Sequence, residues 1–142
     1  MNVFPIQLIN QSTFIAMDYI AEIGGILSRV EGVDYAYLFG SAIKRLGPDS
    51  DVEILLGGDF DFEQKTRLAM ELSLHLKRNV DLVLAKEASY ELVLNALSRG
   101  RPIFVHKKES LRQDYFNSYF LFDANTPLRN IRLERVKRIY AT

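Results

Sequence analysis

The stretch Leu38-Phe39-Gly40-Ser41, followed nine residues later by Asp51-Val52-Glu53, decides the fold of this chain. The run from Tyr35 to Phe39 is aromatic and aliphatic and stops at Gly-Ser, which is typical of a strand that ends in a turn. A glycine lets backbone N–H groups approach an anion, and a following serine can cap a new helix. The end of this strand is therefore a candidate phosphate-binding turn.

Acidic residues interrupt the two apolar runs that follow this turn. Asp51 and Glu53 stand two apart at the start of the first run, so both side chains leave the same face of a strand. Asp81 interrupts the second run, Asn79-Val80-Asp81-Leu82-Val83-Leu84. Like charges in half-buried strands are unfavourable unless a cation offsets them. Three acids on neighbouring strands therefore predict a site for one or two Mg²⁺ ions.

These residues resemble the minimal nucleotidyltransferase domain of the polymerase-β-like superfamily, over roughly residues 15 to 106. The family pattern is Gly-Ser, ten residues, then Asp-x-Asp, with a third Asp on a later strand. This chain departs from it twice, because nine residues intervene and Glu53 stands where Asp is usual. A turn such as Leu46-Gly47-Pro48-Asp49 absorbs a one-residue deletion. The glutamate is the larger change, since octahedral Mg²⁺ tolerates displaced ligands poorly.

The resemblance implies a role for each residue of the pattern. Asp51, Glu53 and Asp81 would be both the catalytic residues and the ligands of Mg²⁺, with ATP as the substrate. Asp81 is the candidate to orient or deprotonate the acceptor hydroxyl, and the products would be an adenylylated acceptor and pyrophosphate. The implied nucleotide-binding residues are Gly40, Ser41, Lys44, Arg45 and Ser50.

Small single-domain members of this superfamily are similar to MntA-type antitoxins of HEPN/MNT toxin–antitoxin modules. That resemblance implies a HEPN-type ribonuclease toxin as partner, bound in a hetero-oligomer and modified with AMP on a tyrosine. Two alternatives stay open. In one, Glu53 marks a catalytically degenerate antitoxin that neutralises its partner by binding only. In the other, the chain is a nucleotidyltransferase that acts on a small molecule or a nucleic-acid end.

Composition sets the broad class. With 142 residues and 48% hydrophobic content, residues 1–142 are expected to form a single domain, with residues 107–142 as a helical, basic and aromatic extension. The absence of cysteine excludes disulfides and thiolate sites and fits a reducing cytoplasm. We expect neither a signal peptide nor a membrane span.

Alternating apolar patterns predict an α/β (α+β) fold, with a small mixed β-sheet flanked by helices. The predicted helices are 14–29, a short turn after Ser41, 62–77, 89–100 and, after Lys107, two helices divided by Pro127. The predicted strands are 34–39, 52–56, the run around Asp81, and 102–106. Asp61 and Ser89 are the expected N-caps of two of these helices.

The end of the chain differs from the rest in charge. Lys and Arg equal Asp and Glu at 18 each overall, but residues 101–142 hold nine basic and four acidic residues. The basic segment after Leu128 is either a solvated helix with its apolar side on the core, or a surface for an acidic partner or nucleic acid. An aromatic cluster before it is explained by core packing or by a partner interface. The cluster consists of Tyr115, Phe116, Tyr119 and Phe120.

Overall fold

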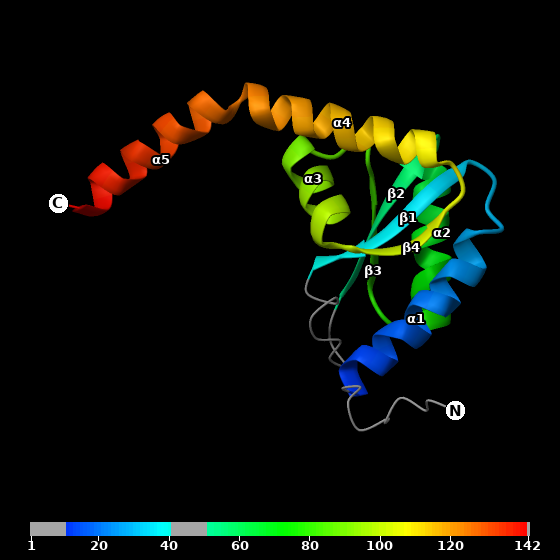
Figure 1. Ribbon diagram of the computed structural model, residues 1–142. Coiled ribbons are helices and arrows are strands. Elements are labelled where there is room, and N and C mark those ends of the chain that lie inside the picture. The colour runs from blue at the N-terminus through cyan, green and yellow to red at the C-terminus, as the bar shows by residue number, and fades with distance from the viewer. Residues whose placement is uncertain (1–10, 41–50, 142) are drawn as a thin grey trace, which may run out of the picture.

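The computed structural model describes residues 11–40 and 51–141 of the chain. The elements are α1 (Gln11–Leu27), β1 (Val33–Phe39), β2 (Val52–Gly58), α2 (Phe62–Leu76), β3 (Val80–Leu84), α3 (Tyr90–Arg99), β4 (Arg101–Val105), α4 (Lys108–Ala124) and α5 (Thr126–Ala141) (Figure 1). Within these described ranges every predicted helix and strand is confirmed, with ends shifted by no more than three residues. The short helical turn predicted after Ser41 lies outside the described residues.

The strands form one mixed sheet in the order β3-β2-β1-β4. β1 runs antiparallel to both of its neighbours, whereas β2 and β3 run parallel because α2 carries the chain back between them. The prediction of a small mixed sheet flanked by helices is therefore confirmed. The register places Phe39 opposite Glu53, and Glu53 beside Asp81.

Helices cover both faces of the sheet (Figure 1). On one face α1 and α2 pack their apolar side chains, such as Leu27 and Leu72, against Ile54 and its alternate neighbours on β2. On the other face α3 and α4 cover Tyr35 and Leu55. Both faces of the central strands are thus buried, so a carboxylate in these strands has to emerge at an end of the sheet.

Capping interactions fix the ends of the two helices that flank β3. The Asp61 carboxylate accepts a hydrogen bond from the Gln64 N–H at 2.7 Å, and the Gln64 side chain accepts one from the Asp61 N–H at 3.1 Å. The Ser89 hydroxyl accepts a hydrogen bond from the Leu92 N–H at 3.2 Å. Both predicted N-caps are therefore confirmed, and they set where α2 and α3 begin.

One buried polar contact holds α4 to the sheet. The Tyr35 hydroxyl, which reaches out from β1, donates a hydrogen bond to Asp114 Oδ2 at 2.6 Å. Burial raises the pKa of Tyr35 far above its usual value, and this hydrogen bond raises it further. The first half of α4 is thereby part of the body of the protein.

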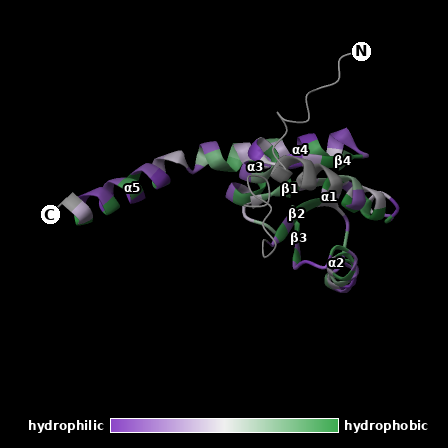
Figure 2. Cartoon of the chain, turned by 90° about the horizontal axis from the view of Figure 1, so that it is seen from below, coloured by the Kyte–Doolittle hydropathy of each residue, from purple (hydrophilic) through white to green (hydrophobic). Residues whose placement is uncertain are grey.

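Beyond this contact the chain leaves the body. α4 ends at Asn125, and Pro127 lies in the first turn of α5, as the predicted division of the two helices requires. α5 extends away from the sheet, with hydrophilic and hydrophobic residues mixed along its length (Figures 1 and 2). None of the helices in the described part of the chain combines the length and hydropathy needed to cross a membrane.

Of the two alternatives for the last helix, packing of its apolar side on the core is wrong. Every residue from Asn130 to Tyr140 is exposed, because α5 projects beyond the sheet and the helices that cover it. Core packing of the aromatic cluster is wrong as well, since Tyr115, Phe116, Tyr119 and Phe120 are all exposed. A partner interface, the alternative for that cluster, stays a prediction.

Candidate functional site

The acidic residues meet at one end of the sheet, where β1 ends and β2 and β3 begin. Glu53 and Asp81 are register partners in a parallel pair, so their backbones lie about 4.8 Å apart. They precede Leu55 and Val83 by two residues, and both of those side chains pack towards α3. Because side chains alternate along a strand, Glu53 and Asp81 emerge on that same face, beyond the buried residues.

Gly40 lies directly against Glu53. Its φ of +80° is in the left-handed region that favours glycine. A Cβ atom built on Gly40 would lie 1.8 Å from Glu53 Oε2, so a larger residue at this position would force the Glu53 carboxylate to move. Phosphate binding by the turn after β1 stays a prediction, and in this conformation the Glu53 side chain lies against its glycine.

Asp51 is tied to the start of the neighbouring strand. Its carboxylate accepts a hydrogen bond from Asn79 Nδ2 at 3.4 Å, and the Asn79 carbonyl accepts one from the Val52 N–H at 2.9 Å. Asn79 therefore links the first residues of β2 and β3 at the site. No local pattern singles out this asparagine, because only the parallel pairing of the two strands brings it beside Asp51.

The carboxylates suit Mg²⁺ in kind and in backbone placement. They are oxygen ligands at one edge of the sheet, which is the chemistry that Mg²⁺ prefers. Within residues 11–40 and 51–141, however, no three His, Cys, Asp or Glu side chains converge closely enough to hold a metal ion. The reason is visible in the contacts, since Glu53 is directed to Gly40 and Asp51 to Asn79. Asp51 and Asp81 are exposed, so both side chains have room to turn.

The remaining predicted nucleotide-binding residues follow Gly40 along the chain. Ser41, Lys44, Arg45 and Ser50 all lie outside the described residues. Of the predicted site, the structure thus describes Gly40 and the three acids.

An apolar cavity lies on the same face of the sheet as Glu53. It has a volume of about 260 Å³ and is lined by Tyr37, Leu97, Leu111, Arg112, Tyr115 and Phe116. Tyr37 precedes Phe39 by two residues on β1, so the cavity lies against the strand whose last residue precedes Gly40. Its aromatic lining suits a flat, largely apolar group.

A family model decides the relationship of this chain to known proteins. The model described as "Polymerase beta, Nucleotidyltransferase" matches residues 21–109. The chain belongs to this nucleotidyltransferase family. The matched residues run from α1 to the start of α4 and include the whole sheet and all three acids. No curated protein matches the chain in a sequence comparison.

Several solved structures of toxin–antitoxin proteins have the same fold. A chain in the crystal structure of the toxin–antitoxin MntA–HepT is 20% identical, with a TM-score of 0.67 over 84% of this chain and 97% of that chain. A toxin–antitoxin structure with AMP-PNP gives a TM-score of 0.68 at the same identity and coverage. A complex of the tri-AMPylated Shewanella oneidensis HEPN toxin with MNT antitoxin gives 0.65 at 20% identity, over 85% of this chain and 98% of that chain.

Proposed function

We propose that this chain is the antitoxin of a HEPN toxin–antitoxin pair, and that it binds the toxin and transfers AMP from ATP to a tyrosine of it. The observation that carries the proposal is the meeting of Gly40, Glu53 and Asp81 at one sheet edge within the family match. The structural neighbours support it, since one contains AMP-PNP and another an AMPylated toxin. We propose a cytoplasmic location, and a single nucleotidyltransferase domain over residues 1–142 whose extension is residues 107–142.

The proposed reaction needs ATP held at the turn and an acceptor hydroxyl beside Asp81. Asp51, Glu53 and Asp81 would hold Mg²⁺, which would offset the charge that develops on the phosphates. The tyrosine oxygen forms a bond to the α-phosphorus, the bond from that phosphorus to the bridging oxygen breaks, and pyrophosphate leaves. Asp81, an exposed carboxylate, takes the proton of the hydroxyl. The cavity beside Tyr37 offers an aromatic surface for the base.

Glu53 controls access to the turn in this proposal. Its carboxylate lies against Gly40, so an incoming phosphate meets a negative charge where the backbone would otherwise bind it. If Glu53 held a divalent cation, the charge of its carboxylate would be offset and the side chain could turn away from Gly40. Nucleotide binding is therefore expected to depend on the divalent cation.

The same contact favours a second candidate function. If Glu53 stays over Gly40 when ATP and Mg²⁺ are present, the turn is blocked and the chain acts by binding alone. Such an antitoxin neutralises its partner without ATP and leaves the toxin unmodified.

Intact mass spectrometry of the toxin encoded beside this chain separates the two functions. The toxin is incubated with Mg²⁺, ATP and the wild-type chain, the Asp51→Ala variant, or a control, Glu71→Ala, which removes an exposed acid from α2. We expect the mass to rise by one or more AMP units with the wild type and the control, and to stay unchanged with Asp51→Ala. An unchanged mass in every case, together with a stable complex, would support the binding-only antitoxin.

A further inference from the structure

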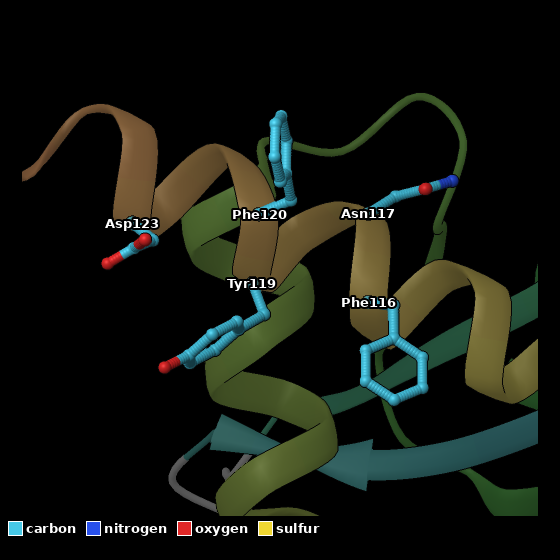
Figure 3. Close-up of a pocket in the computed structure, with 5 residues that line it drawn as sticks. All are labelled: Phe116, Asn117, Tyr119, Phe120 and Asp123. Atoms are coloured by element: carbon cyan, nitrogen blue, oxygen red, sulfur yellow. The ribbon is translucent and has the colours of Figure 1, made fainter.

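Exposed apolar side chains concentrate at one end of the described molecule. Large exposed hydrophobic residues occur on α2, which has three, and on α4 and α5, which carry the other twelve. Three of them on α4, Phe116, Tyr119 and Phe120, line a surface groove of about 370 Å³ together with Asn117 and Asp123 (Figure 3). Large apolar side chains left exposed along one segment of a domain indicate an interaction site. We call residues 116–140 the C-terminal arm.

The arm is braced where its two helices join. The Arg129 guanidinium stacks 3.5 Å from the centre of the Phe122 ring. It donates hydrogen bonds to the Phe122 carbonyl and the Thr126 hydroxyl, both at 2.6 Å. Asn125 donates to the Leu121 carbonyl at 2.7 Å. These contacts span the break between α4 and α5, so the arm presents its side chains in a fixed arrangement, which lowers the entropy lost on binding.

Charge restricts what can cover the arm. α5 has five basic side chains against Glu134, and exposed Leu128, Ile131, Leu133 and Val136 lie between them. A second arm would bring like charges together, which disfavours pairing of two copies through α5. Nucleic acid would match the basic residues but leave the aromatic groove on α4 uncovered. The occupant that matches both is a protein surface that is apolar and acidic.

We propose that the C-terminal arm is the toxin-binding surface, and that it docks on an apolar groove of the toxin flanked by carboxylates. This inference rests on the proposed function, since it names the surface that the partner uses. The aromatic side chains of α4 supply the buried centre of the contact and the arginines of α5 its charged rim.

The position of the arm connects binding with transfer. In Figure 1 the arm leaves the body on the side where β1 ends, which is also where the acids lie. A toxin held by the arm would therefore lie on the same side of the body as Glu53 and Asp81. Binding through the arm raises the effective concentration of the acceptor at the site without a contact to the acids themselves.

A pair of matched variants tests this proposal. Phe120 on the arm and Phe62 on α2 are the same residue type with the same exposure, at 72% and 73%. We measure the Kd for the toxin of Phe120→Asp and Phe62→Asp by isothermal titration calorimetry. Phe120→Asp is expected to raise Kd at least about 30-fold, as loss of an aromatic hot spot does. Phe62→Asp is expected to bind as the wild type does. Circular dichroism checks that both variants are folded.

Other outcomes of the same measurement overturn the proposal. If Phe120→Asp binds the toxin as tightly as the wild type, the arm is not the docking surface, and AMP transfer by the wild type would leave the proposed function standing. If the wild type neither binds nor modifies the toxin, the proposed function fails as well. Self-association of the wild type in sedimentation velocity, abolished by Phe120→Asp with toxin binding unchanged, would assign the arm to a second copy. If the wild type bound RNA and Arg132→Glu lost this RNA binding while toxin binding stayed unchanged, the arm would be assigned to nucleic acid.

Discussion

The sheet edge and the C-terminal arm are opposite departures from the usual distribution of residues. At the sheet edge, carboxylates stand in strands whose other side chains are buried on both faces. On the arm, aromatic and aliphatic side chains stand exposed among basic ones. Each departure is unfavourable in the isolated chain, because charge is concentrated in the first and apolar surface is left in water in the second. Under the proposed function both regions would be completed by other molecules, an ion with its nucleotide at the sheet edge and the toxin on the arm.

The largest expected effect is on the chemistry of the sheet edge alone. Asp51→Ala is expected to lower AMP transfer by about 100-fold or more, the scale seen when a group that stabilises developing charge is removed. Its affinity for the toxin is expected to match that of the wild type, because Asp51 lies at the start of β2 and not on the arm. Transfer is measured by intact mass and affinity by calorimetry. A variant that loses toxin binding along with transfer would mean that the two regions are not separate.

The contact between Gly40 and Glu53 gives the next largest effect. Gly40→Ala puts a Cβ atom on the Glu53 carboxylate and places alanine at a φ of +80°. We expect a fall in AMP transfer of about 10-fold to 100-fold from the displaced turn, and a loss of about 1 kcal/mol in the free energy of unfolding. Gly25→Ala is the control, since a Cβ added at Gly25 meets nothing within 4 Å. Normal transfer by Gly40→Ala would show that the turn does not bind the nucleotide.

Charge reversal on the arm is expected to act on binding and not on chemistry. The double variant Arg132→Glu, Arg135→Glu should raise the Kd for the toxin by about 10-fold, with a larger effect at low ionic strength. The transfer rate at saturating toxin should stay that of the wild type. Arg67→Glu, which changes an exposed arginine on α2, is the control. Equal loss of affinity in the control would mean that the effect follows net charge and not the arm.

Tyr35 tests the part of α4 that belongs to the body. Tyr35→Phe removes the hydrogen bond to the half-buried Asp114 and should lower the free energy of unfolding by about 1–2 kcal/mol. Since burial and this hydrogen bond hold the pKa of Tyr35 above its unfolded value, the stability they confer is complete below about pH 10 and falls as the pH rises further. Denaturation of both proteins between neutral and alkaline pH checks this. The phenylalanine variant should lack the alkaline loss that tyrosine ionisation causes.

The smallest effect is expected at the far end of β2. A hydrogen bond from Lys86 at 2.5 Å lowers the pKa of Asp59, so the small stability from this pair is present above the usual pKa and is lost as the pH falls through the lowered one. Because Asp59 is fully exposed, Asp59→Asn should leave transfer and toxin binding unchanged. NMR titration of the Asp59 carboxyl measures the pKa. A fall in AMP transfer by Asp59→Asn would show that the functional carboxylates are not confined to the end of the sheet at Asp51.

The sequence predicted the sheet edge well because its signals are local. The apolar run that ends at Gly40 and the acids two apart in β2 depend on the alternation of side chains along a strand, which needs no tertiary contact. The caps at Asp61 and Ser89 are equally local. Asn79 was missed because its contact with Asp51 depends on the parallel pairing of β2 with β3.

The exposure of the arm could not be predicted from the sequence, for a physical reason. Apolar residues at helical spacing, such as Phe116 and Phe120, predict a buried face, but the pattern does not say whether the covering surface belongs to the same chain. Charge was the better indicator, since the basic residues of α5 are interleaved with its apolar ones and leave no purely apolar side for the core. The predicted single domain with an extension over residues 107–142 stays a prediction, although α4 is divided between the body at Asp114 and the arm.

The initial rate of AMP transfer as a function of toxin concentration tests the separation of the two regions most directly. The rate is measured for the wild type, Phe120→Asp and Asp51→Ala at saturating ATP and Mg²⁺. We predict that Phe120→Asp raises KM for the toxin while kcat stays near the wild-type value. Asp51→Ala is expected to lower kcat, so that its transfer rate stays low at every toxin concentration. A lowered kcat with unchanged KM in Phe120→Asp, or recovery of Asp51→Ala at high toxin concentration, would contradict it.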